Sequence, residues 1–354
     1  MNKILKYKIY VIVLIYLLCS SYVYADIKFI ENFRAKGNKI YKSYKDTLYI
    51  LNKNELYEYR NKCLVKFFTN DNGINDIVFN GNFIVIFNIN EIFVLNEYTK
   101  DILWTKQFIG KIIGKPILTN FHVILDKNST KLVSFDVNTG LISWKFYLDI
   151  PNFSFGTNSV LLYNQHHLVY VYANRKVIIL NKKSGKHLKT YGLNKRKISG
   201  VHEHDFYIVK ALLYNDILYL CYDNGSITLF DLRCGAFIVN NFDSKYKDFL
   251  VYKNQIVFFN GSNIISHDKF NGKILWQFEC DKFYNYLLLT KKKILLLYND
   301  LGELYFINID NGKLIKYTIL KKYIIKKILV NNEEDTIWVF SNKDNISVFN
   351  IDFL

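Results

Sequence analysis

Two short histidine clusters are the residues best suited to bind a metal ion. They are His166–His167 and the run His202-Glu203-His204. Alternate residues of a strand share a face, so His202 and His204 could present two imidazoles to zinc. A tetrahedral site needs a third and a fourth ligand, and those would have to come from elsewhere in the chain. We therefore favour solvated loop histidines and predict no metal site.

The sequence carries no recognisable motif for a nucleophile or for phosphate binding. It has no Gly-x-Ser-x-Gly, no glycine-rich phosphate loop and no carboxylate pair repeated at a fixed spacing. An even number of cysteines in an exported protein permits disulfides. None is arranged as Cys-x-x-Cys, and we favour buried small apolar residues for Cys63, Cys221, Cys234 and Cys280. We predict no catalytic residue and no cofactor, hence no enzyme.

The N-terminus has the layout of an export signal. MNKILKYK supplies three lysines and is followed by the apolar run IYVIVLIYLLCSS. Cleavage after Ala25 is the preferred interpretation, which gives a signal peptide at 1–25 and a mature chain at 26–354. Lipidation at Cys19 and an uncleaved anchor remain alternatives. All three send the body of the protein across a membrane.

The composition describes a large globular core with a basic surface. The 354 residues are 50% apolar and 17% aromatic, and the formal net charge is +16. The lysine runs are short and interrupted, as in KKYIIKK at 321–327. We therefore predict solvated lysines and no nucleic-acid partner. Whether the basic surface contacts lipid stays open.

One phrase recurs along the chain and organises it. LVSFDVNTGLISW (132–144), ITLFDLRCGAFIV (227–239) and IISHDKFNGKILW (264–276) are three of eight copies, spaced 37 to 50 residues apart. Two further short apolar runs precede the copies, so each unit is expected to have four antiparallel strands. The chain after Ala25 divides into eight units of about 41 residues. This predicts an all-β, eight-bladed β-propeller in which the segment DIKFIENF (26–33) supplies the missing strand of the last blade.

Three positions of the phrase have predicted structural roles. Carboxylates at the end of the third strand are expected to accept turn N–H groups, and they are Asp136, Asp231, Asp268 and Asp310. Glycines are expected where the turn needs a positive φ, and they are Gly140, Gly185, Gly235, Gly272 and Gly312. Tryptophans four residues after the glycine position are expected to pack between blades, and they are Trp104, Trp144 and Trp276. The copies with Lys189, Val239 or Lys316 there should have weaker contacts.

The phrase apolar-Asp-x-x-Thr/Ser-Gly-x-x-x-Trp resembles the repeat of the quinoprotein (PQQ-like) propellers. Within that superfamily YNDILYLCYDNGSITLFDLRCGAFI (214–238) is similar to the BamB family of the bacterial outer-membrane β-barrel assembly machinery. The resemblance implies a non-catalytic scaffold, monomeric within a complex, that binds the periplasmic domains of the BamA insertase. The alternatives are a periplasmic protein-binding propeller outside that complex and a quinoprotein oxidoreductase remnant. The chain lacks the adjacent Cys-Cys pair of the quinoprotein enzymes, which disfavours the remnant.

The resemblance also implies where the partner binds. In BamB-like proteins the contact comes from loops between the middle blades, here PNFSFG (151–156) and ISGVHEHD (198–205). Phe153 and Phe155 match the apolar positions of the first loop, whereas Gly156 stands at its arginine position. Gly200 and His202 stand at the acidic positions of the second loop. Because 192–205 is also the most polar insertion of the repeat, we predict a binding loop there, and its candidate contacts are Arg196, Ile198 and His202.

Overall fold

The structure is a computed structural model, and it consists of β-strands joined by turns. It describes residues 27–34, 40–45, 47–60, 63–148, 159–172, 176–193, 197–198, 201–202, 208–223, 227–238, 248–280, 285–289, 292–320, 324–331, 336–341 and 345–351. These residues contain no helix, and hence no helix that could span a membrane. The predicted signal peptide at 1–25 lies outside them.

The chain separates into two compact units, and the larger, Gly37–Phe283, contains six four-stranded antiparallel sheets in its described part. Each sheet is one blade, with its strands paired in chain order. Blade 1 is β2 (Ile40–Tyr44), β3 (Thr47–Asn52), β4 (Glu55–Arg60) and β5 (Cys63–Thr69). Blade 2 is β6 (Asp76–Asn80), β7 (Phe83–Phe87), β8 (Glu91–Asn96) and β9 (Ile102–Gln107). Blade 3 is β10 (Ile112–Leu118), β11 (His122–Lys127), β12 (Lys131–Asp136) and β13 (Ile142–Tyr147).

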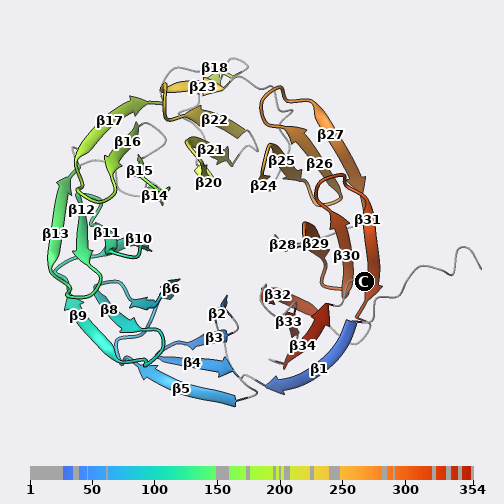
Figure 1. Ribbon diagram of the computed structural model, residues 1–354, viewed down its shortest axis with the longest axis horizontal. Helices are drawn as coiled ribbons and strands as arrows, with labels where there is room; N and C mark the ends of the chain where they lie inside the picture. Colours follow the sequence, from blue (N-terminus) through green and yellow to red (C-terminus); the bar gives the residue numbers. More distant parts are fainter. Residues whose placement is uncertain are drawn as a thin grey trace, which may run out of the picture. The chain divides into compact units, whose positions relative to one another are not determined.

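The remaining blades of this unit follow the same plan. Blade 4 is β14 (Val160–Tyr163), β15 (His167–Tyr172), β16 (Lys176–Asn181) and β17 (His187–Gly192). The short pair β18 (Lys197–Ile198) and β19 (Val201–His202) precedes blade 5, which is β20 (Ile208–Tyr214), β21 (Ile217–Tyr222), β22 (Ile227–Asp231) and β23 (Ala236–Ile238). Blade 6 is β24 (Asp248–Tyr252), β25 (Gln255–Phe259), β26 (Asn263–Asp268) and β27 (Ile274–Glu279). Within the unit, first strands such as β6 and β10 lie on the concave side and fourth strands such as β9 and β13 on the convex side (Figure 1).

The second unit, Met1–Lys36 with Tyr284–Leu354, contains two more sheets of the same kind. Blade 7 is β28 (Asn285–Leu289), β29 (Ile294–Tyr298), β30 (Glu303–Asn308) and β31 (Leu314–Ile319). Blade 8 is β32 (Ile325–Asn331), β33 (Thr336–Ser341), β34 (Asn345–Ile351) and β1 (Ile27–Arg34). Because β1 pairs antiparallel with β34, the N-terminal segment supplies the fourth strand of the last blade, as the sequence predicts. Eight four-stranded blades confirm the all-β, eight-bladed β-propeller.

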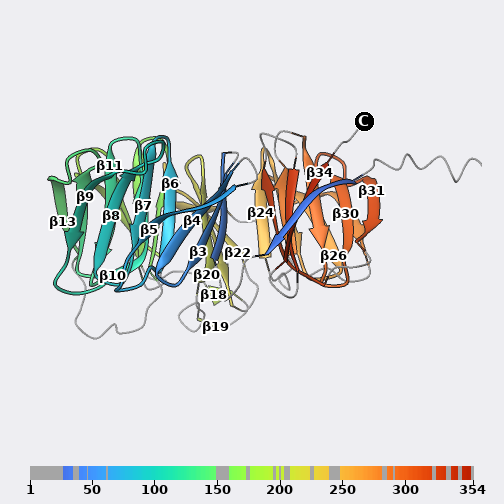
Figure 2. The ribbon, with the colours of Figure 1, turned by 90° about the horizontal axis from the view of Figure 1, so that it is seen from below.

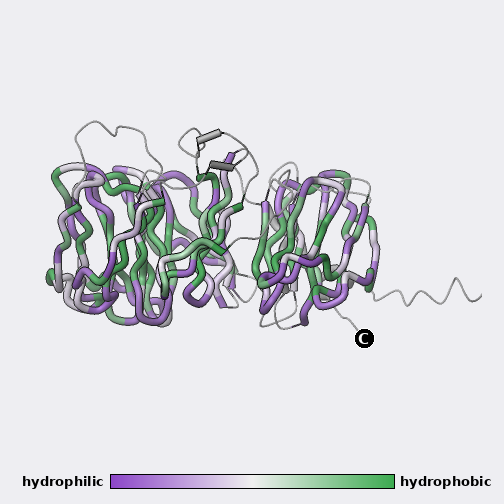
Figure 3. Tube along the Cα trace, turned by 90° about the horizontal axis from the view of Figure 1, so that it is seen from above, coloured by the Kyte–Doolittle hydropathy of each residue, from purple (hydrophilic) through white to green (hydrophobic). Residues whose placement is uncertain are grey.

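The middle strands of the blades form the core, and the fourth strands face solvent. All six residues of β21 and all five of β29 are buried, whereas β13 and β27 are mostly exposed, each with a single buried residue, Trp144 and Trp276. Second strands consist of near-continuous apolar runs because both of their faces are covered by neighbouring blades. Figure 3 shows the hydrophobic stretches within the strands and hydrophilic stretches at many of the turns.

The turn between third and fourth strands is built around one side-chain acceptor. In blade 3, Asp136 accepts the N–H groups of Asn138 and Thr139 at 3.0 and 2.8 Å. Gly140 then takes a φ of +69°, where a side chain would be strained. Asp231 and Asp268 accept turn N–H groups in the same way, and the φ values of Gly185, Gly235, Gly272 and Gly312 lie between +66° and +70°.

Asp310 was predicted to accept the turn N–H groups of its blade, and this was wrong by two residues. In blade 7 the acceptor is Asn308, whose Oδ1 receives the N–H of Asp310 at 2.9 Å. The short side chain of Asn offers the same oxygen geometry as Asp, so a search for carboxylates overlooks it. Asn181 and Asn96 occupy the equivalent place in blades 4 and 2.

Aromatic side chains cover the turn glycines of the following blade. A Cβ added to Gly140 would stand 2.7 Å from the Trp104 ring of blade 2, and one added to Gly185 would overlap the Trp144 ring of blade 3. Trp104 also donates from Nε1 to the carbonyl of Val137 at 2.7 Å. Trp276 is buried as well, but its Nε1 donates at 3.1 Å to Gln255 Oε1 of its own blade.

The weaker contact expected at Lys189 does not arise, because Tyr191 provides the aromatic ring instead. A Cβ on Gly235 would overlap the Tyr191 ring, and the Tyr191 hydroxyl lies 3.4 Å from the carbonyl of Leu232. Lys189 extends to the carbonyl of Arg233 at 3.3 Å. The position of the aromatic residue has moved two residues along the strand, to the next residue on the same face.

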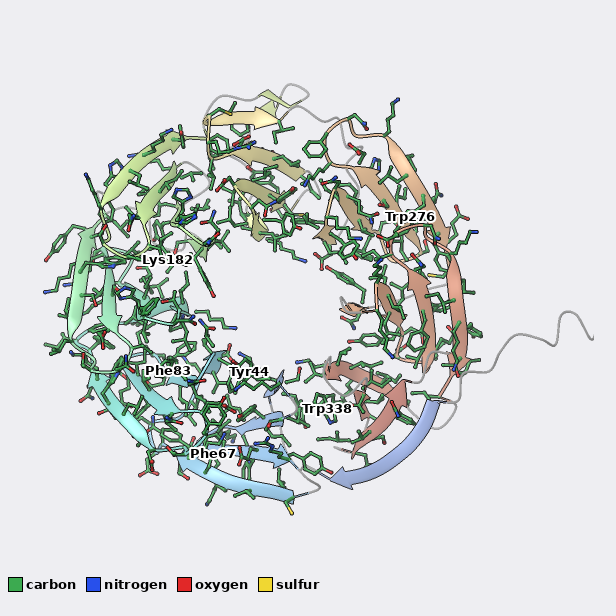
Figure 4. The ribbon with its side chains drawn as sticks, viewed as in Figure 1. Tyr44, Phe67, Phe83, Lys182, Trp276 and Trp338 are labelled. Atoms are coloured by element: carbon green, nitrogen blue, oxygen red, sulfur yellow. The ribbon has the colours of Figure 1, made fainter. Side chains whose placement is uncertain are left out.

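Blade 2 has Lys100 at the glycine position, and there the contact is ionic. Lys100 has a φ of +63°, and its ammonium lies 2.6 Å from the Glu97 carbonyl and 2.8 Å from Glu58 Oε2. The same ammonium stands 5.2 Å from the ring centroid of Phe67 in blade 1. Figure 4 labels Phe67 beside the boundary of blades 1 and 2. A cation over an aromatic face replaces the aromatic-on-glycine contact.

The cysteines are only partly as expected. The four that the structure describes form no disulfide. Cys221 is buried, and burial raises the pKa of its thiol to about 11. The expectation of burial was wrong for Cys63 and Cys234, which are exposed because they lie at turns between third and fourth strands.

We expect Gly140→Ala to destabilise the protein by about 2–4 kcal/mol, since it combines a strained φ with overlap on Trp104. Gly114→Ala is the matched control: φ is +66° there, but nothing lies within 4 Å of the added Cβ. That variant should lose only about 1–2 kcal/mol. Urea denaturation midpoints measure both, and equal losses would contradict a contact role for Trp104.

We expect Lys100→Met to destabilise the protein by about 1–3 kcal/mol, because it removes a half-buried donor from Glu58 and Glu97. Lys183→Met, a change of an exposed residue in the equivalent turn of blade 4, should cost less than about 0.5 kcal/mol. Thermal unfolding of the two variants tests this. A Lys100 variant as stable as the parent would show that the ion pairs at the blade 1–2 boundary contribute nothing.

Candidate partner-binding face

The blades expose two different sets of turns in the Gly37–Phe283 unit. We name one side the glycine face: it carries the turns from first to second strand and from third to fourth, including Gly140. The other is the connecting face, with the turns from second to third strand and the segments that run from one blade to the next. The described ends of both insertions that contain the predicted partner loops belong to the connecting face, since each insertion follows a fourth strand and precedes a first strand. The β18–β19 pair stands beyond the blades on that side (Figure 2).

The connections on this face differ in length. Blades 2 and 3 are joined by residues 108–111, blades 3 and 4 by 148–159, and blades 4 and 5 by 193–207. The two long connections contain the candidates Phe153, Phe155 and Arg196, which lie outside the described residues. Long insertions between rigid strands are where propellers carry binding residues. What the structure does describe is how these insertions are held at their ends.

The first insertion is anchored by a buried leucine and a buried carboxylate. Leu148, 8% exposed, packs in a cluster with Trp144 and Leu168, and its N–H donates to the Thr130 carbonyl at 2.8 Å. At the other end Ser159 Oγ donates to Asp126 Oδ2 at 3.3 Å. The hydroxyl of Tyr170 in blade 4 donates to the same oxygen at 2.8 Å. Asp126 therefore joins blade 3 to blade 4 next to Ser159, the described end of the insertion.

Asp126 is a buried carboxylate near the first insertion that the sequence analysis did not single out. It is 3% exposed, and its Oδ1 has no hydrogen-bond partner in the described part of the chain. Burial raises the pKa of this carboxyl, while the bonds from Tyr170 and Ser159 act in the opposite direction. No motif marks it, because its partners come from another blade.

The second insertion is held by two buried apolar residues. Leu193 and Ile208, 1% and 2% exposed, belong to one cluster with Leu218 and Leu220 of blade 5. Between them β18 pairs with β19, with Lys197 opposite His202 and Ile198 opposite Val201. The candidates Ile198 and His202 thus lie on a short hairpin rather than an irregular loop. The Ser199-Gly200 pair between two β-branched residues was the signal that could have predicted it.

The histidine clusters are separate features. Among the described residues, no group of three or more His, Cys, Asp or Glu side chains is placed to hold a metal ion. His166 is exposed on the glycine face, and His167 Nδ1 lies 3.5 Å from Asp216 Oδ1 of blade 5. His202 is on the connecting face, and its neighbours Glu203 and His204 lie outside the described residues.

The fold defines a class: an eight-bladed propeller of PQQ-like repeats, here with long insertions between its middle blades. The family model described as outer membrane protein assembly factor BamB matches residues 71–278, which is more than half of the chain. The chain therefore belongs to the BamB family.

Curated relatives and solved structures are similar at low identity. Outer membrane protein assembly factors BamB from Yersinia pestis and Shewanella oneidensis are 20% and 23% identical over 63% and 62% of this chain. The matches span 58% and 57% of those relatives' own lengths, less than two thirds. BamB from Moraxella catarrhalis has a similar fold, with a TM-score of 0.65 at 16% identity over 92% of this chain and 100% of that one. The computationally designed Ika8 protein has a TM-score of 0.70 at 12% identity, over 92% of this chain and 100% of its own.

We expect the free energy of unfolding of Asp126→Asn to increase relative to that of the parent as pH rises. A carboxyl whose folded pKa is raised contributes stability below its unfolded pKa and loses it as pH rises through the folded pKa. Asp136→Asn is the control of opposite sign. Burial raises the pKa of Asp136, but the N–H groups and hydroxyl of its turn outweigh this and lower it, so its stabilisation is present at high pH and lost on acidification.

Urea denaturation of both variants between acid and neutral pH measures these two slopes. If the stability of the Asp126 variant changed with pH in the same direction as that of the Asp136 variant, the raised pKa assigned to the buried Asp126 carboxyl would be wrong.

Proposed function

We propose that this chain is a non-catalytic scaffold of the outer-membrane β-barrel assembly machinery that binds the periplasmic domains of a BamA-type insertase. It would act as an exported protein, in the periplasm and peripheral to the outer membrane. The observation that carries the proposal is that the family match at 71–278 covers the blades whose connections bear the two long insertions. Membership in the BamB family supports the class of partner.

The geometry of the connecting face suits a scaffold. Buried anchors at Leu148, Leu193 and Ile208 hold the insertions at their ends, so the loops would be presented to a partner from fixed positions. Binding from preorganised ends reduces the ordering cost of association. Rigid blades and long connections on one side therefore support protein binding on that side.

The replaced charges favour one alternative, a periplasmic protein-binding propeller outside the assembly complex. Gly156 and Gly200 stand where the family's contact has charged residues, as does His202. A partner that no longer supplies complementary charges would accept these changes. The same experiment distinguishes the two functions.

We expect a cross-linked pull-down of the mature protein from envelope of its own host to enrich a BamA-type insertase. Phe153→Ala with Phe155→Ala should reduce that enrichment by about tenfold or more, since apolar anchors dominate such interfaces. The matched control is Phe121→Ala with Phe270→Ala, two aromatic residues of the glycine face that are 61% and 62% exposed. Mass spectrometry identifies the captured proteins.

The control pair should leave the enrichment unchanged. Capture of other envelope proteins without the insertase would favour the alternative function. If both pairs of substitutions reduced the enrichment of the insertase equally, the assignment of the binding site to the connecting face would be wrong.

A further inference from the structure

The connecting face of blades 2 and 3 exposes apolar side chains outside the two insertions. Ile109 is 94% exposed, Tyr147 69% and Ile89 54%. Ile109 lies in the connection of blades 2 and 3, Ile89 in the turn between β7 and β8, and Tyr147 at the end of β13. We name these three residues the isoleucine patch. An isoleucine so fully exposed gains nothing from the fold of the monomer.

The turn that carries Ile109 is fixed on both sides. Phe108 donates its N–H to the Asn90 carbonyl at 2.7 Å, and Ile112 donates to the Ile89 carbonyl at 2.6 Å. On the blade 3 side, Lys111 donates its N–H to Asn128 Oδ1 at 2.6 Å, and the N–H of Asn128 donates to the Lys111 carbonyl at 2.9 Å. Bonds to two blades hold Ile109 in one position, as in a preorganised contact residue.

The patch extends to Leu148, the described start of the first insertion. The turn of Asn128 leads to Lys131, whose ammonium stands 5.8 Å from the ring centroid of Tyr147. The next residue, Leu148, donates its N–H to Thr130 of that turn and begins the insertion with Phe153 and Phe155. The isoleucine patch thus lies beside the described start of that insertion on the connecting face.

Lysines surround the patch. Lys111 is exposed beside Ile109, Lys127 places its ammonium 5.6 Å from the ring centroid of Phe108, and Lys131 lies at Tyr147. Glu91 lies two residues from Ile89, and its carboxylate accepts amide N–H groups from Asn88 and Asn72 at 2.7 and 3.1 Å. Asp149, two residues after Tyr147, lies outside the described residues. An apolar centre with a cationic rim is complementary to an apolar surface bordered by carboxylates.

We propose that the isoleucine patch is a second docking site for the protein partner, receiving an apolar surface of the insertase's periplasmic domains that is rimmed by acidic side chains. Ile109 is the central contact, and Lys111, Lys127 and Lys131 pair with the acidic rim. The inference rests on the proposed function and extends its site from blades 3–5 to blade 2.

The test is the dissociation constant of purified protein (residues 26–354) for the purified periplasmic domains of its host's insertase. Ile109→Asp should weaken binding by about tenfold or more, because it places a charge in the apolar centre. Lys111→Glu should weaken binding more at low than at high ionic strength, as expected of a rim charge. Phe121→Asp, equally polar but on the glycine face, is the control and should bind as the parent does.

The outcomes separate the two hypotheses. If the parent binds and Ile109→Asp binds equally well, the patch is not a docking site and the proposed function stands. If the parent itself does not bind, the proposed function and the patch assignment both fail. Analytical ultracentrifugation of the parent and the Ile109 variant tests whether a second copy of this chain binds the patch instead. If the parent self-associates and the variant does not, the patch is a contact between copies and the inference is overturned. Circular dichroism of each variant confirms that it is folded.

Discussion

The packing of neighbouring blades depends on one contact, between a side chain of one blade and the turn from third to fourth strand in the next blade. A glycine with positive φ leaves a flat surface, and an aromatic ring from the preceding blade covers it, as Trp104 covers Gly140. The ring also satisfies a carbonyl that the turn leaves without a strand partner, here Val137. These contacts join blade 2 to blade 3, blade 3 to blade 4 and blade 4 to blade 5 on the glycine face, and leave the connecting face free to carry insertions.

The solutions found at this contact show what is physically required. Tyr191 keeps an aromatic ring and a hydroxyl near the carbonyl, and Lys100 supplies a cation to the equivalent carbonyl of Glu97. Trp104, Tyr191 and Lys100 each supply a donor for one carbonyl and a packed group over or within the turn. Trp144 keeps only the packed ring, because its Nε1 has no hydrogen-bond partner among the described residues. Towards the connecting face a buried polar contact also joins two blades, since the Tyr170 hydroxyl of blade 4 donates to Asp126 of blade 3.

The fold could be predicted because its signals are local and repeated. The phrase ending in Gly and Trp recurs at a propeller period, and the unfinished last copy predicts a fourth strand from the N-terminus. Tyr191, Lys100 and Asp126 could not be assigned, since each depends on a neighbour from another blade. The same holds for Ile109, whose exposure follows from bonds to both blade 2 and blade 3. The candidates Phe153, Phe155 and Arg196 stay predictions from the family pattern.

The pairing of β1 with β34 has a consequence for how the protein reaches its native state. The last blade joins residues from the two ends of the described chain, with Ile27 opposite Ile351, so its sheet has the largest sequence separation of any in the described part. Such non-local pairing is slow, because nearly the whole chain must be ordered before the two strands meet. Until then β34 keeps an open edge, which is a site for misassembly. A protein proposed to help other β-sheets assemble would thus itself finish folding late, when β1 pairs with β34.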